Sequence, residues 1–183
     1  MNSVSFNIIE SKNLSNKSSK YLGLPSIPES WIEDENLFEE DDMFLCQINL
    51  EDLIEFSVPI TKLGILYFFI NLKTEQGKVL YSKETNNLVK VDFNDGLIDS
   101  SREFKIYFEL NEEIYLDGTK LLGIPVDNKD FDSKEEILLL QIDTLHENNI
   151  FKNDENIVYQ FIMKKEDFVR NNYSNVRLDI LEI

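Results

Sequence analysis

The chain has 183 residues, of which 42% are hydrophobic and 11% aromatic, a composition that supports a packed interior and argues against intrinsic disorder. Its 35 acidic and 18 basic residues give a net charge of −17, which disfavours binding to nucleic acids and to anionic membranes. A basic protein is the partner that such a charge attracts, although an acidic surface can also serve solubility alone.

The N-terminal segment has no basic stretch followed by a long apolar run, so we expect no signal peptide. No apolar stretch reaches the roughly 18 residues of a membrane-spanning helix. The single cysteine, Cys46, excludes an intrachain disulfide and fits a reducing compartment. It lies in an apolar strand-like segment, where a buried, inert thiol is usual. These features predict a cytoplasmic protein.

Alternating apolar and polar residues dominate the chain. The period-two patterns at 3–9, 104–110 and 175–181 are typical of half-buried strands. The almost continuous apolar runs at 64–70 and 136–142 indicate strands that are covered on both faces.

Helix signals are few and turn signals are local. Short helices are expected within 49–56 and 164–172. The segments TEQGK, FNDG and LDGTK place Gly77, Gly96 and Gly118 where a turn with positive φ is expected. The predicted fold class is therefore mainly β (α+β), with largely antiparallel sheets and a few short helices.

Three motifs recur in the same order in the two halves of the chain. The pairs are LGLPSIP at 22–28 with LGIPVDN at 122–128, FLCQINLEDL at 44–53 with LLLQIDTLHE at 138–147, and ILYFFINLKTE at 65–75 with IVYQFIMKKED at 157–167. The separations within the pairs decrease slowly along the chain, as loop trimming after a duplication would produce. We therefore expect one domain over 1–183 that is built from two repeats, at about 17–100 and 101–183.

Each repeat contains a Leu-Gly-x-Pro turn about twenty residues before a strand that carries a glutamine. Gly23 and Gly123 permit positive φ or a close backbone approach. A glutamine in an apolar strand needs a hydrogen-bond partner if it is buried. Gln47 and Gln141 are therefore expected either to bond to the preceding turn or, together with Tyr67, to contact a ligand in a pocket between the repeats.

An acidic run follows Trp31, the only tryptophan. Its seven carboxylates within 33–42 are Glu33, Asp34, Glu35, Glu39, Glu40, Asp41 and Asp42. This composition indicates a solvated loop, a contact surface for a basic partner with Trp31 as its aromatic anchor, or a weak divalent-cation site. The run contains no glycine to shape a cation cage, so we predict no metal here.

Other catalytic or metal signatures are absent or incomplete. Segment 92–103 resembles a calcium loop at its ends, but Gly96 lies one position early. His146 is the only histidine, and the sequence contains neither a nucleophile elbow nor a phosphate-binding glycine loop. We therefore expect no cofactor, and an activity other than catalysis is favoured.

The ordered motifs resemble the YwqG-like family of bacterial cytoplasmic proteins. The matching segments are SKYLGLPSIPESW at 19–31, MFLCQINLEDL at 43–53, LGILYFFI at 63–70, KLLGIPVD at 120–127, ILLLQID at 137–143 and VYQFIMKKEDFVRNNYSNV at 158–176. The resemblance implies an internally duplicated, largely antiparallel β architecture and no established activity. Leu22 departs from the family pattern, which has a glycine there.

Two hypotheses about function follow. The first is a non-catalytic acidic module that binds a basic protein through Trp31 and the acidic run, in the manner of an immunity protein that neutralises a toxin. The alternative is a small-molecule binder or enzyme with its pocket between the repeats, near Gln47, Tyr67 and Gln141. Beyond these two, a purely structural subunit is a third interpretation, which predicts stable self-association without a ligand. The sequence leaves the oligomeric state open.

Overall fold

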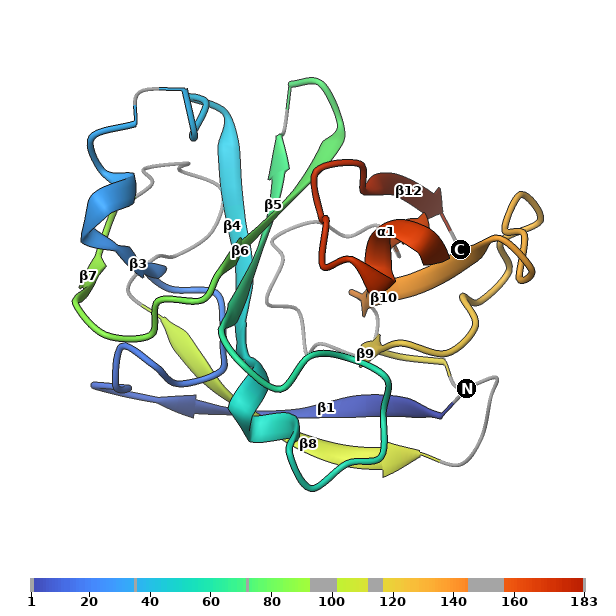
Figure 1. Ribbon diagram of the computed structural model, residues 1–183, viewed down its shortest axis with the longest axis horizontal. Helices are drawn as coiled ribbons and strands as arrows, with labels where there is room; N and C mark the ends of the chain where they lie inside the picture. Colours follow the sequence, from blue (N-terminus) through green and yellow to red (C-terminus); the bar gives the residue numbers. More distant parts are fainter. Residues whose placement is uncertain are drawn as a thin grey trace. The chain divides into compact units, whose positions relative to one another are not determined.

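The protein is mainly β, as the sequence predicts. The computed structural model describes residues 2–34, 36–71, 73–92, 102–111, 117–144 and 157–182. Of these residues, 47% are in strands and 8% in helices (Figure 1). All strand pairs with a defined register are antiparallel. No helix within the described residues is long and apolar enough to span a membrane.

The chain divides into two compact units. Unit 1 comprises Met1–Asn7, Phe56–Val58 and Phe108–Ile183, and unit 2 comprises Ile8–Glu55 and Pro59–Tyr107. Each unit has its own antiparallel strands and its own buried residues.

Unit 2 is built on a set of antiparallel strands that includes the predicted buried strand at 64–70. In order, the strands are β8 (Glu103–Asn111), β2 (Lys20–Tyr21), β4 (Asp42–Asn49), β5 (Ile65–Asn71) and β6 (Gln76–Ser82). Strands β4, β5 and β6 lie side by side (Figure 1). Every residue of β4 and β5 is buried, as expected for apolar strands that are covered on both faces.

A second, two-stranded sheet in unit 2 packs on this core. Strand β3 (Ser26–Pro28) pairs with β7 (Leu88–Lys90). The cluster that joins them to β4 and β5 contains Ile27, Phe44, Ile65, Tyr67, Phe69 and Leu88. Two 3-10 helices complete the unit, η1 (Glu29–Trp31) and η2 (Leu50–Leu53), and η2 confirms the helix expected within 49–56.

Unit 1 contains the second fully apolar strand and the only α-helix in the described part of the chain. Its strands, in order, are β12 (Arg177–Glu182), β11 (Ile157–Lys164), β10 (Glu136–Asp143), β9 (Lys120–Leu121) and the start of β1 (Ser3–Ser11). Helix α1 (Lys165–Val169) follows β11 directly and confirms the helix expected within 164–172.

The two Leu-Gly-x-Pro segments form the same backbone turn. Leu22 and Gly23 have φ values of 56° and 73°, and Leu122 and Gly123 have values of 61° and 91°. Positive φ was expected for the glycines but not for the leucines, because a side chain at φ > 0 is strained. Both leucines are buried, so packing holds them in this conformation.

The turn predictions for the other glycines have mixed outcomes. Gly118 has a φ of 88°, as expected. The prediction for Gly77 is wrong, because Gly77 lies within β6 and the residue with positive φ is Glu75, at 55°. The turn predicted at Gly96 and the calcium-like segment 92–103 lie largely outside the described residues, as does His146.

Candidate functional site

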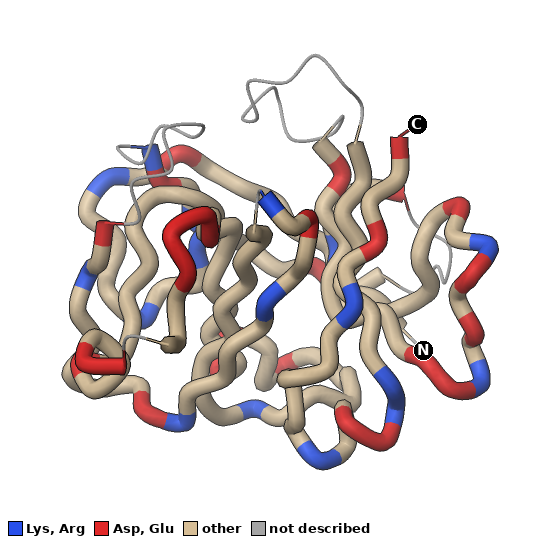
Figure 2. The backbone as a smooth tube through the Cα atoms, turned by 90° about the horizontal axis from the view of Figure 1, so that it is seen from above, with Lys and Arg blue, Asp and Glu red and all other residues tan. Residues whose placement is uncertain are grey.

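The acidic run forms an exposed segment that begins immediately after η1. Glu33, Asp34, Glu39, Glu40 and Asp41 are exposed, and Glu35 lies outside the described residues. Figure 2 marks the acidic and basic residues along the described backbone, and the full sequence has 35 acidic and 18 basic residues. The segment therefore presents carboxylates to solvent that are available to an external cation.

Asp42, the last residue of the run, differs from the others because it is buried. The Asn71 side-chain amide donates to Asp42 Oδ1 at 3.1 Å, and the Glu39 backbone N–H donates to Asp42 Oδ2 at 2.9 Å. The Lys78 ammonium also contacts the Asp42 carboxylate and lies 3.8 Å from Glu39 Oε1. Asp42 thus fixes the end of the acidic segment and is not part of its exposed surface.

Trp31 attaches the start of the segment to the core of unit 2. Its ring lies 5.4 Å from that of Tyr67, centroid to centroid, in an edge-to-face arrangement. It is half-buried against the apolar cluster described above. The next residue, Ile32, is instead 54% exposed and lies directly beside Glu33. The apolar side chain that this segment offers to a partner is therefore Ile32 more than Trp31.

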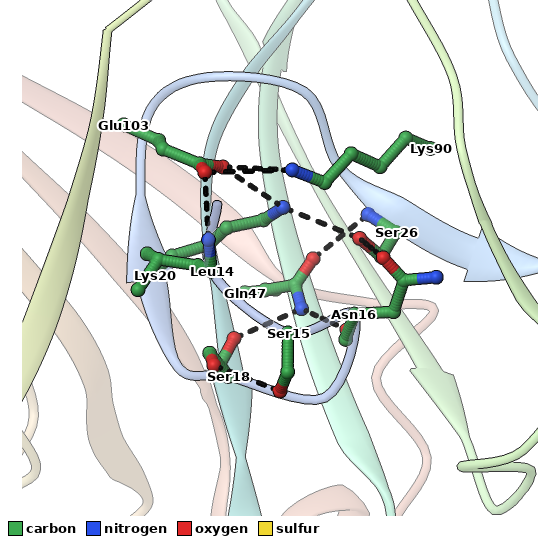
Figure 3. A network of polar contacts seen from close by, with 9 residues as sticks. All are labelled: Leu14, Ser15, Asn16, Ser18, Lys20, Ser26, Gln47, Lys90 and Glu103. Atoms are coloured by element: carbon green, nitrogen blue, oxygen red, sulfur yellow. Dashed lines mark hydrogen bonds and ion pairs between the residues drawn. The ribbon is translucent and has the colours of Figure 1, made fainter. Parts of the chain in front are cut away.

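Gln47 and Tyr67 hold the turn that follows Pro25. They are register partners on β4 and β5. The Ser26 backbone N–H donates to Gln47 Oε1 at 2.9 Å, and the Tyr67 hydroxyl donates to the Ser26 carbonyl at 2.8 Å. The Gln47 amide also donates to the carbonyls of Asn16 and Ser18, at 2.9 and 3.0 Å (Figure 3). The expected bond between Gln47 and the preceding turn is confirmed.

A buried ionic cluster lies beside Gln47. Lys20 has no exposed side-chain surface, and its Nζ is 3.6 Å from Glu103 Oε2 and 3.2 Å from Ser26 Oγ. Lys90 donates to the same carboxylate at 3.2 Å, and the Leu14 backbone N–H donates to Glu103 Oε1 at 3.0 Å (Figure 3).

Burial and neighbouring charges shift the pKa values of the ionisable residues in and beside this cluster. It lowers the pKa of Lys20 from 10.5 to about 8, although the Glu103 carboxylate opposes the shift. Burial alone would raise the pKa of Glu103, but the Leu14 hydrogen bond and the two lysines together lower it. Burial and the carboxylate of Glu84 raise the pKa of Tyr67. At neutral pH, Lys20 is therefore a charged, hydrogen-bonded group inside unit 2.

Gln141 makes the corresponding contacts in unit 1. The Val126 backbone N–H donates to Gln141 Oε1 at 3.0 Å, and the Gln141 amide donates to the Gly118 carbonyl at 2.9 Å. The Gln160 amide donates to the Val126 carbonyl at 2.8 Å and to Gln141 Oε1 at 3.2 Å. The expected bond between this glutamine and its preceding turn is also confirmed.

The pairing of β4 with β5 and of β10 with β11 aligns the third motif pair differently from the sequence comparison. The residue opposite Gln47 is Tyr67, and the residue opposite Gln141 is Gln160. Tyr159 lies opposite Ile142 instead, so the alignment of Tyr67 with Tyr159 is wrong by one residue. Gln47, Tyr67 and Gln141 each have hydrogen-bond partners in their own unit, and the hypothesis that they line a common pocket stays a prediction.

Lys20 and Lys120 were not singled out by sequence reasoning. Each begins a two-residue strand before a Leu-Gly turn, and each is fully buried. Burial lowers the pKa of Lys120 to about 8 as well, opposed by the Asp117 carboxylate. Their shared position, 100 residues apart before Leu-Gly-x-Pro, is the signal that could have identified them.

Comparison with known proteins adds no identification. No family model matches the chain, and no curated protein matches it significantly.

Proposed function

We propose that the protein is a non-catalytic module that binds a basic protein through the acidic segment of unit 2. The observation that carries this proposal is the exposure of Ile32 beside Glu33 and Asp34, on a segment fixed at both ends. Trp31 packs against Tyr67 at one end, and Asp42 binds Lys78 and Asn71 at the other. A segment that is attached at both ends loses less conformational entropy on binding than a free loop.

The exposed charged and apolar side chains of the segment indicate what kind of surface the partner must have. Exposed carboxylates at Glu33, Asp34, Glu40 and Asp41 would be paired by Lys or Arg side chains of the partner, and Ile32 would enter an apolar recess between them. A toxin with a basic active site is one such protein, so an immunity-like role belongs to this proposal. The net charge of −17 would accelerate the encounter with that partner.

Affinity capture from a bacterial lysate tests this proposal when performed at low and at high salt. The expected partner is basic, is captured at low salt and is lost at high salt, because exposed charge pairs are screened. Ile32→Ala combined with Glu33→Lys and Glu40→Lys should abolish its capture. The matched control is Ile54→Ala combined with Glu51→Lys and Glu55→Lys, because Ile54 is 62% exposed between two acidic residues. Equal capture by both variants contradicts the proposal.

We also propose that the chain contains two repeats, at about 17–100 and 101–183, and that it is a divergent, cytoplasmic member of the YwqG-like family. The support is the shared local design described above: a buried lysine, a turn with two positive φ values and a glutamine that binds it. Strands β4 and β10 also carry irregularities at comparable places, between Phe44 and Cys46 and between Leu138 and Leu140. Expression of residues 8–107, the continuous span that contains unit 2, tests the repeat. This span should fold alone if it is an independent copy, and failure to fold would argue against the repeat.

A further inference from the structure

A groove in unit 2 lies apart from the acidic segment. It is lined by Ser15–Lys17 and Thr85–Leu88 and has a volume of about 510 Å³. The groove is open to solvent, and most of its lining residues are exposed, so it suits a ligand that stays partly solvated when bound. Apart from Leu88, the lining side chains are amides, hydroxyls and one ammonium group. The lining contains no carboxylate, although the chain has almost twice as many acidic as basic residues.

One wall of the groove is held firmly by the buried network. The Asn16 side-chain amide donates to the Leu88 carbonyl at 2.7 Å, and the Asn16 backbone carbonyl accepts from the Gln47 side-chain amide at 2.9 Å. The Leu14 backbone N–H binds Glu103, and the Ser15 and Ser18 hydroxyls lie 3.0 Å apart (Figure 3). The loop that contains Lys17 is therefore fixed in place before any ligand arrives.

The other polar side chains of the groove are not used by the fold. Within the described part of the chain, no residue forms a hydrogen bond or ion pair with the side chains of Lys17, Thr85, Asn86 or Asn87. An ammonium group, a hydroxyl and two carboxamides at one groove thus keep their full hydrogen-bonding capacity. Ammonium groups pair with phosphate, and carboxamides can both donate to and accept from sugar hydroxyls.

We propose that this groove binds a small phosphorylated polyhydroxyl compound, with Lys17 at the phosphate and Asn86 and Asn87 at the hydroxyls. The Lys90 ammonium, which is one-third exposed, and the buried Lys20 pair with the Glu103 carboxylate, so Lys17 is the cation that the groove offers to a ligand. This inference is independent of the proposed protein-binding segment.

Titration of the isotopically labelled full chain, followed by NMR, tests the site with glucose 6-phosphate as the probe. Backbone and side-chain amide signals of 15–17 and 85–88 should shift, with saturation at millimolar concentrations. Glucose and inorganic phosphate, titrated separately, should each bind at least about tenfold more weakly, because each supplies only part of the contacts. Phosphate binding as tight as that of glucose 6-phosphate would overturn the polyhydroxyl assignment.

Three variants separate binding at this groove from general charge effects. Lys17→Ala should weaken glucose 6-phosphate binding about tenfold, as expected when one hydrogen bond to a charged group is lost. Lys73→Ala, which removes an exposed lysine outside the groove, should leave the binding unchanged. Asn86→Ala should weaken the binding of glucose 6-phosphate but not that of phosphate. No shift in these amide signals, or equal effects of Lys17→Ala and Lys73→Ala, would overturn the proposal.

Discussion

Lys20 Nζ lies 3.6 Å from Glu103 Oε2 in the interior of unit 2, where the lysine side chain has no exposed surface. The pair is the centre of a polar network that joins β2, β8, the 14–18 loop and the turn after Pro25. A buried charge without its partner is costly, so this network imposes strict requirements on the residues around it.

Removal of the carboxylate should be strongly destabilising. Glu103→Gln leaves two lysines at the site without a counter-ion and should lower the free energy of unfolding by about 3 kcal/mol. The matched control is Glu10→Gln, because Glu10 pairs with Arg102 at the surface, 3.0 Å apart and largely exposed. That change should cost less than about 1 kcal/mol. Urea unfolding of both variants measures the difference, and equal costs would contradict the central role of Glu103.

Stability should depend on pH through the buried lysines. A lysine with a folded-state pKa of about 8 and an unfolded value of 10.5 binds a proton in the unfolded but not the folded state between these values. Stability should therefore rise with pH from about 8 toward 10, by up to about 1.4 kcal/mol per pH unit for each lysine. This added stability is lost again as the pH falls back through the folded-state pKa of about 8.

The difference between wild type and Lys20→Met isolates one of these contributions. General charge repulsion and the ionisation of unfolded tyrosines above about pH 10 affect both proteins and largely cancel. We expect the stability of wild type to rise relative to Lys20→Met between pH 8 and pH 10 in chemical unfolding experiments. A constant difference across this range would show that Lys20 titrates normally in the folded protein.

The glutamine contacts should be structural in both units. Gln47→Leu leaves the Ser26 N–H and the Asn16 and Ser18 carbonyls without this partner, and Gln141→Leu does the same to the Val126 N–H. Each substitution should destabilise the protein by about 1–3 kcal/mol per orphaned buried group, up to a few kcal/mol in total. Thermal unfolding measures the loss. A neutral Gln47→Leu would show that this turn does not need the hydrogen bond.

Gly23 should tolerate no side chain. Its φ is 73°, and a Cβ atom there would lie 2.7 Å from Glu103 Cβ. Gly23→Ala should therefore cost more than the roughly 1 kcal/mol of left-handed strain alone, because Glu103 must move. Gly77→Ala, within strand β6 and without positive φ, is the control and should be close to neutral in its effect on the melting temperature. Similar losses for the two variants would contradict this account.

Much of the fold follows from local sequence pattern. Alternation and apolar runs locate β1, β5, β8, β10 and β12, because strand periodicity directly reflects which face is buried. The hydrogen bonds of Gln47 and Gln141 were also predictable, because a buried amide in an apolar strand requires a partner.

The ionic cluster could not be predicted in the same way. A lysine before a turn usually lies at the surface, and the burial of Lys20 depends on the carboxylate of Glu103, which is distant in sequence. The burial of Asp42 could not be predicted for the same reason. In sequence Asp42 is one of several adjacent acidic residues, and its partners Lys78 and Asn71 are distant along the chain. Register errors such as Tyr67 with Tyr159 arise because a one-residue slip between apolar strands leaves the hydrophobic pattern almost unchanged.

The most direct test of the proposed function is calorimetric titration of the full chain with the purified basic partner. At low salt, Ile32→Ala combined with Glu33→Lys and Glu40→Lys should raise the Kd at least about a hundredfold, because an apolar anchor and two charge contacts are lost together. The matched variant at Ile54, Glu51 and Glu55 should bind like wild type. If the Kd of the Ile32 variant is unchanged, the acidic segment does not bind the partner, whether or not the Ile54 variant loses binding. That result would contradict the proposal.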